Sequence, residues 1–220
     1  MELLHFAATK ALASSAAFLL MTVLLMAAAK RISTCVAIFA AQSAVMTAEI
    51  LAVAYVQRSS EALAVGLLVF VTKVVAIPSL LLWIVKEINI AREVESATTA
   101  SQSVFIAASL ILLAFFAVQP YARTLRVDEN MLAASIALVL TGAFLMVSRR
   151  KALMQVIGLL VLENGIFLAA LITTFGMPLM IEIGIAFDLL MGVFLMGLFV
   201  FRIRETFEHL DVSKLRRLRG

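Results

Sequence analysis

Seven runs of about twenty apolar residues constrain this chain more than any other feature of its sequence. A helix that crosses a bilayer needs roughly 20 consecutive apolar residues. Of the 220 residues, 64% are hydrophobic and 15% are charged, whereas soluble domains are typically about half apolar. The sequence therefore predicts an all-α integral membrane protein with about seven transmembrane helices, at residues 8–29, 33–57, 62–85, 102–120, 131–148, 152–174 and 178–201.

The composition excludes several classes of function. One cysteine, Cys35, and two histidines, His5 and His209, are too few for an iron–sulfur cluster or a Cys/His zinc site within this chain. The formal net charge of +4 resides in short loops and a basic tail, where membrane topology explains it better than nucleic-acid binding does. We therefore expect no metal site, no redox centre in this chain and no nucleic-acid partner.

The distribution of Lys and Arg predicts the orientation of the chain. Thirteen of these residues lie on the side that holds residues 30–31, 86–101, 149–151 and the tail, and four lie on the other side. Short loops rich in Lys and Arg stay in the cytoplasm. The sequence therefore predicts an amino terminus outside and a carboxyl terminus in the cytoplasm.

The 86–101 loop is the longest connection, and it divides the chain. We predict a three-helix membrane segment, a cytoplasmic loop with a fourth helix, a second three-helix segment and a basic cytoplasmic tail, at residues 1–90, 91–130, 131–202 and 203–220. The two triplets echo each other, because each has a basic turn, then a polar pair, then an ionisable residue in its third span. The polar pairs are Gln42/Ser43 and Glu163/Asn164, and ancient duplication is one interpretation of the pattern.

Five ionisable side chains fall inside the predicted spans, namely Glu49, Lys73, Glu163, Glu182 and Asp188. Each costs on the order of 2.5–3.5 kcal/mol at the centre of a membrane helix. Lys73, Glu163 and Asp188 lie 10 or 11 residues from the outer ends of their spans. At about 1.5 Å per residue they are roughly 15–16 Å deep in a core about 30 Å thick. Glu49 is about one turn shallower, and Glu182 is close enough to its span end to reach the interface.

A shared depth near the bilayer centre favours a relay of protons among Glu163, Asp188 and Lys73, with Glu49 and Glu182 as further stations. A buried carboxyl favours its neutral form and a nearby ammonium favours the charged one, a combination suited to exchanging protons. The structural alternative is a static pair between Lys73 and Glu49 that keeps two helices in register.

Four further residues support the predicted relay. Gly184 and Gly192 flank Asp188 at intervals of four residues, so one face of that helix can approach another helix closely. Pro78 cannot donate to the carbonyl oxygen of the fourth residue before it, which frees an acceptor one residue from Lys73 and predicts a kink in this helix. Asn164 can hydrogen-bond a water molecule or a neighbouring helix beside Glu163.

The segments "SRRKALMQVIGLLVLENG", "EIGIAFDLLMGVFLMGLFVFRIRE" and "LDVSKLRRLRG" resemble the small three-helix K (4L) subunit of respiratory complex I over residues 130–220. With "FVTKVVAIP" in the first half, the whole chain resembles component E of hydrogenase-4 and formate hydrogenlyase-type complexes. When the "IGL" triplets are aligned, the buried glutamate of the K subunit falls at Leu160, one helical turn before Glu163. Asp188 and Glu182 both remain candidates for the second acidic role.

The resemblance implies a non-catalytic membrane-arm subunit of an energy-converting NiFe-hydrogenase complex in a prokaryotic cytoplasmic (inner) membrane. It places the NiFe centre and the iron–sulfur clusters in partner subunits, and it makes antiporter-like membrane subunits the neighbours of this chain. Proton translocation is the implied task. The alternatives are a subunit of a multisubunit cation/proton antiporter, and a structural adaptor that joins antiporter-like subunits.

Overall fold

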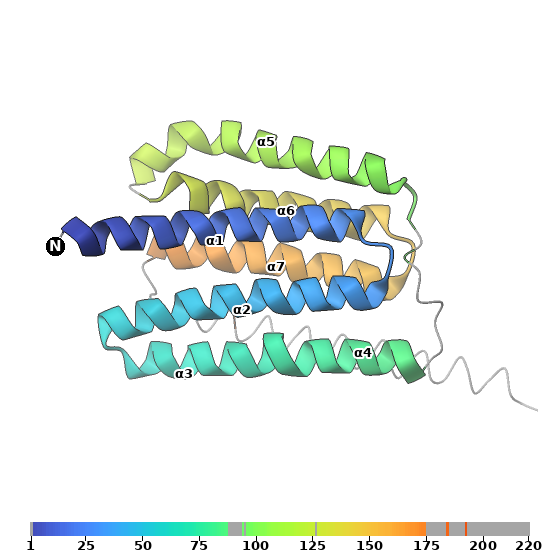
Figure 1. Cartoon of the computed structure of the whole chain (residues 1–220), viewed down its shortest axis with the longest axis horizontal. Coiled ribbons are helices and arrows are strands. Elements are labelled where there is room, and N and C mark those ends of the chain that lie inside the picture. Colours follow the sequence, from blue (N-terminus) through green and yellow to red (C-terminus); the bar gives the residue numbers. More distant parts are fainter. Residues whose placement is uncertain are drawn as a thin grey trace, which may run out of the picture.

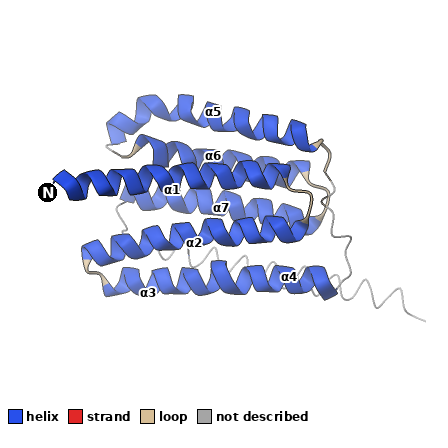
Figure 2. Cartoon of the chain, viewed as in Figure 1, coloured by secondary structure: helices blue, strands red, loops and turns tan. Residues whose placement is uncertain are grey.

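In the computed structural model of the chain the helices form a bundle in which successive rods alternate in direction, and α3 and α4 lie end to end in one of these rods (Figure 1). The structure describes residues 2–87, 94, 96–125, 127–174, 184 and 192. Within these residues Figure 2 shows helices and connecting loops and no strand, and an isolated antiparallel bridge joins Ser96 to Arg149. The predicted all-α class is therefore confirmed.

The helices follow the apolar runs closely, and the third run is one rod made of three consecutive helical elements, α3, η1 and α4. A π-helical turn, η1, interrupts that rod in the middle. The elements are α1 (Glu2–Ala28), α2 (Ile32–Gln57), α3 (Ser60–Val69), η1 (Phe70–Ala76), α4 (Ile77–Glu87), α5 (Ala100–Leu125), α6 (Glu129–Ser148) and α7 (Ala152–Thr174).

Five stretches of the described helices are long and apolar enough to cross a membrane, and they match the second to sixth predicted spans. The first predicted span falls on α1, whose described apolar part, Ser14–Ala28, is shorter. The seventh, residues 178–201, lies outside the described residues apart from two glycines. The count of seven and the orientation of the termini stay predictions. The five stretches are Ile32–Tyr55, Ala62–Lys86, Ala100–Tyr121, Glu129–Ser148 and Ala152–Thr173.

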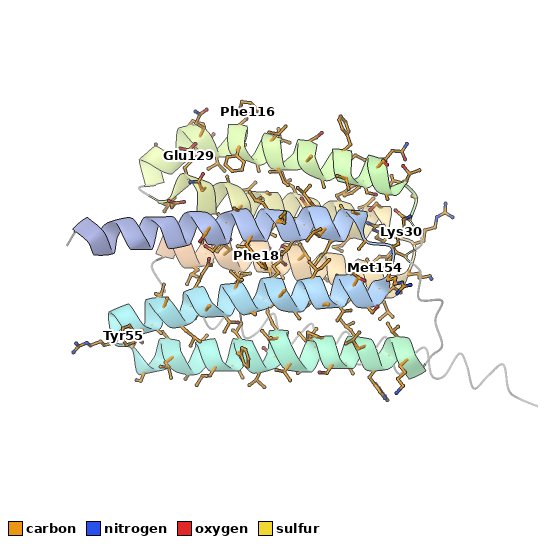
Figure 3. The ribbon with its side chains drawn as sticks, in the orientation of Figure 1. Phe18, Lys30, Tyr55, Phe116, Glu129 and Met154 are labelled. Atoms are coloured by element: carbon orange, nitrogen blue, oxygen red, sulfur yellow. The ribbon has the colours of Figure 1, made fainter. Side chains whose placement is uncertain are left out.

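The connections fall at two opposite ends of the bundle. Figure 3 shows Lys30 and Met154 toward one end, and Tyr55 and Glu129 toward the other. The turns that we grouped as cytoplasmic, after α1 and α6, therefore share one end, which supports the grouping of loops behind the topology prediction.

Side-chain caps begin two helices at the end opposite the basic turns. The Ser59 hydroxyl accepts a hydrogen bond from the Ala62 amide at 3.2 Å and begins α3. The Asp128 carboxylate accepts one from the Met131 amide at 3.0 Å and begins α6. Both satisfy amide groups that have no partner inside the helix, so these short turns return the chain directly into the bundle.

Helices α6 and α7 pack with their backbones in contact because glycines line their interface. A Cβ atom on Gly142 would lie 2.5 Å from the Leu162 backbone nitrogen, and one on Gly165 would lie 2.7 Å from the Ser135 carbonyl oxygen. Small residues allow such close approach between membrane helices. This contact fixes the rotation of α7, and with it the direction in which its polar side chains point.

Arg149 holds the basic end of the bundle together. Its side chain is 4% exposed, and Nη2 donates to the Ala27 carbonyl oxygen at 2.9 Å and to that of Met26 at 3.4 Å, at the end of α1. Burial lowers the pKa of this guanidinium, and the nearby Cys35 thiol opposes that shift. We had interpreted Arg149 only as a topology signal, but it also satisfies helix carbonyls that would otherwise lack donors.

Candidate functional site

A buried ion pair lies between η1 and α7. Lys73 Nζ donates to Glu163 Oε1 at 2.7 Å, and the two side chains are 4% and 5% exposed. The residues are separated by 90 positions in the chain. Their contact agrees with the equal depths that we expected from counting residues along their spans.

The π-helical turn η1 carries Lys73. At its end the Ile77 amide donates to the Thr72 carbonyl oxygen, five residues back, and the Thr72 hydroxyl bonds to the carbonyl oxygen of Leu68 at 2.9 Å. Pro78 follows as the second residue of α4 and lacks the N–H that would continue the hydrogen bonds of this rod. Next to Pro78 the structure thus has a π-helical turn, a feature that is frequent at functional sites, whereas the predicted kink stays a prediction.

A chain of hydrogen bonds leads away from Lys73 toward α1. Lys73 Nζ donates to Asn164 Oδ1 at 3.2 Å, and Asn164 Nδ2 donates to Gln42 Oε1 at 3.1 Å. Gln42 Nε2 donates to the Thr22 hydroxyl at 2.9 Å, and that hydroxyl donates to the Leu19 carbonyl oxygen at 2.5 Å. All of these side chains are buried, so the polar groups of η1, α7, α2 and α1 form one connected site.

Two other contacts complete the surroundings of the ion pair. The ammonium of Lys73 lies 5.7 Å from the centre of the Phe167 ring, within the range of a cation–π interaction. Asn164 Nδ2 also lies 3.3 Å from the Ser43 hydroxyl. Among the described residues the Asn164 amide and the Phe167 ring therefore lie next to the ammonium, and the Ser43 hydroxyl lies next to that amide. A buried pair needs such extra partners, because its mutual attraction alone need not offset the loss of hydration.

Glu49 lies apart from this pair. Its carboxyl is half-buried on α2 with the Ser15 side chain of α1 beside it, and neither oxygen makes a well-formed hydrogen bond within the described part of the chain. The alternative pair between Lys73 and Glu49 does not occur there, since Lys73 pairs with Glu163. Glu49 lies seven residues after Gln42, so both are on one face of α2 about two turns apart.

Several predicted site residues belong to the last span. Glu182 and Asp188 lie outside the described residues. Gly184 is described, and a Cβ atom there would lie 2.9 Å from Cε2 of Phe167. The same ring contacts Lys73, and the predicted role of Gly184 beside Asp188 stays a prediction. A Cβ atom on Gly192 would meet no described atom within 4 Å, and the predicted role of Gly192 stays a prediction.

Sequence reasoning did not assign Thr22, Gln42 and Ser43 to the site. Their signal was present, because Gln42/Ser43 was the polar pair that echoed Glu163/Asn164 in the other half of the chain. The structure brings the two pairs into direct contact. The echo was therefore informative about packing, although we had considered it only as a trace of duplication.

Comparison with known proteins identifies relatives over most of the chain. An uncharacterised protein of Mycobacterium tuberculosis is 36% identical over 159 residues, which cover 71% of this chain and 72% of that protein. Hydrogenase-4 component E of Escherichia coli K12 is 30% identical over 152 residues, which cover 69% of this chain and 70% of that protein. The same component of Shigella flexneri matches equally well. No family model matches the chain, and no solved structure matches it.

Proposed function

The chain belongs to the hydrogenase-4 component E family, and from this premise we propose that Lys73 and Glu163 take part in proton translocation by a hydrogenase complex. Homology over two thirds of the chain supports a membrane subunit of such a complex. The five apolar helices support a multi-pass membrane protein. The role of the buried pair extends beyond what the family name states.

The buried ion pair of Lys73 and Glu163 is the observation that carries this proposal. The two residues lie near the middle of two apolar spans. Charged side chains at membrane depth are costly, and they mark ion pathways and proton relays. Here hydrogen bonds among a connected set of buried polar side chains offset part of the free-energy cost of burying the charges. A membrane subunit without an ion-conducting task has less reason to maintain such a site.

The proposed step is a proton exchange at Glu163. When its carboxylate takes up a proton, the pair loses its negative member while the Lys73 ammonium keeps its positive charge. In surroundings of low polarity this charge acts strongly on neighbouring ionisable groups, so it favours release of protons from carboxyls around it. We propose Glu49, Asp188, Glu182 and carboxylates of adjoining subunits as the exchange partners.

The remainder of the machinery belongs to other subunits in this proposal. NiFe and iron–sulfur centres in a peripheral arm supply the energy, and antiporter-like membrane subunits adjoin this chain in a prokaryotic cytoplasmic membrane. Relatives named as hydrogenase components favour this assembly over a cation/proton antiporter without a redox arm.

A structural adaptor is the second candidate function, and a specific observation favours it. The hydrogen bonds of Lys73, Asn164, Gln42 and Thr22 join four separate helical elements. A network of this kind can specify one arrangement of helices without moving any proton.

The substitution Glu163→Gln separates the two functions. Glutamine keeps the size of the side chain and an acceptor for Lys73, but it cannot release a proton. We expect the complex to assemble and to turn over hydrogen with artificial electron carriers. Proton translocation into membrane vesicles should fall sharply, and Glu163→Asp should retain part of it.

Glu129→Gln is the matched control, because it makes the same chemical change at an exposed position at one end of the bundle. Translocation in that variant should equal the wild-type rate. Vesicles with Glu163→Gln that also translocate protons at the wild-type rate would remove Glu163 from the proton path and leave the structural adaptor as the better description.

A further inference from the structure

The hydrogen-bond chain from Lys73 to α1 has one possible direction. An ammonium group donates and has no lone pair, so Asn164 must turn its Oδ1 toward Lys73. Its Nδ2 then points to Gln42, which must present Oε1 in return. The remaining Nε2 of Gln42 donates to Thr22. The Thr22 hydroxyl accepts this bond, and it donates its own proton to the Leu19 carbonyl oxygen.

Aligned donors polarise one another, and each bond in such a chain strengthens the next. The oxygen end of every amide dipole in this chain faces the ammonium. A hydrogen bond from a charged donor is also stronger than one from a neutral donor. The chain therefore stabilises the charged Lys73 side chain independently of Glu163, and it is anchored at its far end to the backbone of α1.

We propose that Asn164, Gln42 and Thr22 position the Lys73 ammonium, so that Glu163 is the member of the pair that takes up and releases the proton. One proton adds to a carboxylate oxygen of Glu163 and later leaves from that carboxyl group, while Lys73 keeps its three protons throughout. This inference rests on the proposed function of the pair and adds the residues that hold the ammonium in place while Glu163 exchanges its proton. Gln42 and Thr22 act through Asn164 and are positioning residues.

The geometry favours this division of tasks. Among the described ion pairs Lys73 is joined to Glu163, and its hydrogen-bond acceptor Asn164 is an amide that cannot change its charge. Displacing Lys73 would break its bond to Asn164 and leave three aligned donors without their charged end. Protonating Glu163 leaves every bond of the chain in place. Protonation of Glu163 is therefore compatible with the hydrogen bonds that hold the Lys73 ammonium.

The test uses Thr22, which among the hydrogen-bonded side chains Asn164, Gln42 and Thr22 is the farthest from the ion pair. Thr22→Val has almost the same shape but leaves Gln42 Nε2 without its acceptor, whereas Thr22→Ser keeps the hydroxyl. Losing one buried hydrogen bond corresponds to a change of roughly threefold to tenfold in an equilibrium or rate. In vesicles that carry the whole complex, we expect the protons translocated per hydrogen turned over to fall by about that factor in Thr22→Val and to recover in Thr22→Ser.

Thr47→Val is the matched control. Thr47 is also buried, and its hydroxyl donates only to a backbone oxygen of its own helix, that of Ser43 at 2.8 Å. An infrared measurement supplies a second readout, because the carboxylate band of Glu163 can be assigned as the band that Glu163→Gln removes. This band should shift in Thr22→Val, where the ammonium is held less firmly, and should stay in place in Thr47→Val.

The outcomes separate this inference from the proposed function. Wild-type translocation and an unshifted band in Thr22→Val, together with a defect in Glu163→Gln, would overturn the positioning role and leave the proton role of Glu163 intact. Normal translocation in Glu163→Gln would remove the proposed function itself. If Thr22→Val does not assemble, Thr22→Cys carries the test, because a thiol is a weak hydrogen-bonding group. Its translocation should then be lower than that of Thr22→Ser, and equality of the two would refute the inference.

Discussion

Replacing Lys73 with methionine tests the energetic side of the buried pair. Met is unbranched and similar in length, so it fills the space of the lysine stem and removes the ammonium. Glu163 is then left in a site where only 5% of its side chain is exposed, without the donor at 2.7 Å. Removing one partner of a buried ion pair typically costs about 3–5 kcal/mol, because the other charge remains buried and uncompensated.

This cost translates into a large change in thermal stability. For a chain of this size 1 kcal/mol shifts the midpoint of thermal unfolding by about 2–4 °C, so Lys73→Met should lower the midpoint by roughly 6–20 °C. The assay is thermal unfolding of the purified subunit in detergent. Lys86→Met is the control, because Lys86 is exposed at the end of α4 and exposed charges contribute little.

A double substitution isolates the pair itself. In Lys73→Met combined with Glu163→Leu neither charge remains, so the double variant should be more stable than Lys73→Met alone, with a coupling of about 2–3 kcal/mol between the two sites. Additive effects of the two substitutions would show that the side chains do not interact energetically. Lys73→Met with the stability of Lys86→Met would refute the reasoning from burial.

Two further predictions concern packing and topology. Gly142→Ala should destabilise the bundle by about 1–3 kcal/mol, because overpacking forces the α6 and α7 backbones apart; an unfolding midpoint equal to that of the wild type would contradict the close contact. Reporter domains fused to the two ends of the chain should lie on opposite sides of the membrane, with the carboxyl-terminal one in the cytoplasm. Two reporters on one side would mean an even number of spans.

Much of the fold could be predicted from the sequence because each membrane helix forms in response to the hydropathy of its own segment. A bilayer core offers backbone groups no hydrogen-bonding water, so an apolar run of sufficient length must be a helix, and the second to sixth spans occur where expected. The ionisable residues in those spans were equally conspicuous. Counting residues along two helices even placed Lys73 and Glu163 at one depth, because the rise per residue hardly varies.

The partner of Lys73 could not be predicted in this way. Depth is a property of one helix, whereas contact depends on which helices are neighbours and on how each is rotated about its axis. Here the glycines of α6 and α7 set the rotation of α7, and the π-helical turn sets the direction of Lys73. Both candidate carboxylates, Glu49 and Glu163, satisfied the depth argument approximately.

By itself the sequence determined the class of protein, the spans for which the structure offers a test, and the set of residues from which a site could be built. Only the tertiary structure decided that Lys73 pairs with Glu163. It also decided that Asn164, Gln42 and Thr22 continue from Lys73 as a series of hydrogen bonds, each residue accepting from the one before it. The physical reason is that hydropathy acts on each segment separately through its solvent, whereas a hydrogen bond needs two side chains within about 3 Å. That proximity arises only when all the helices have packed.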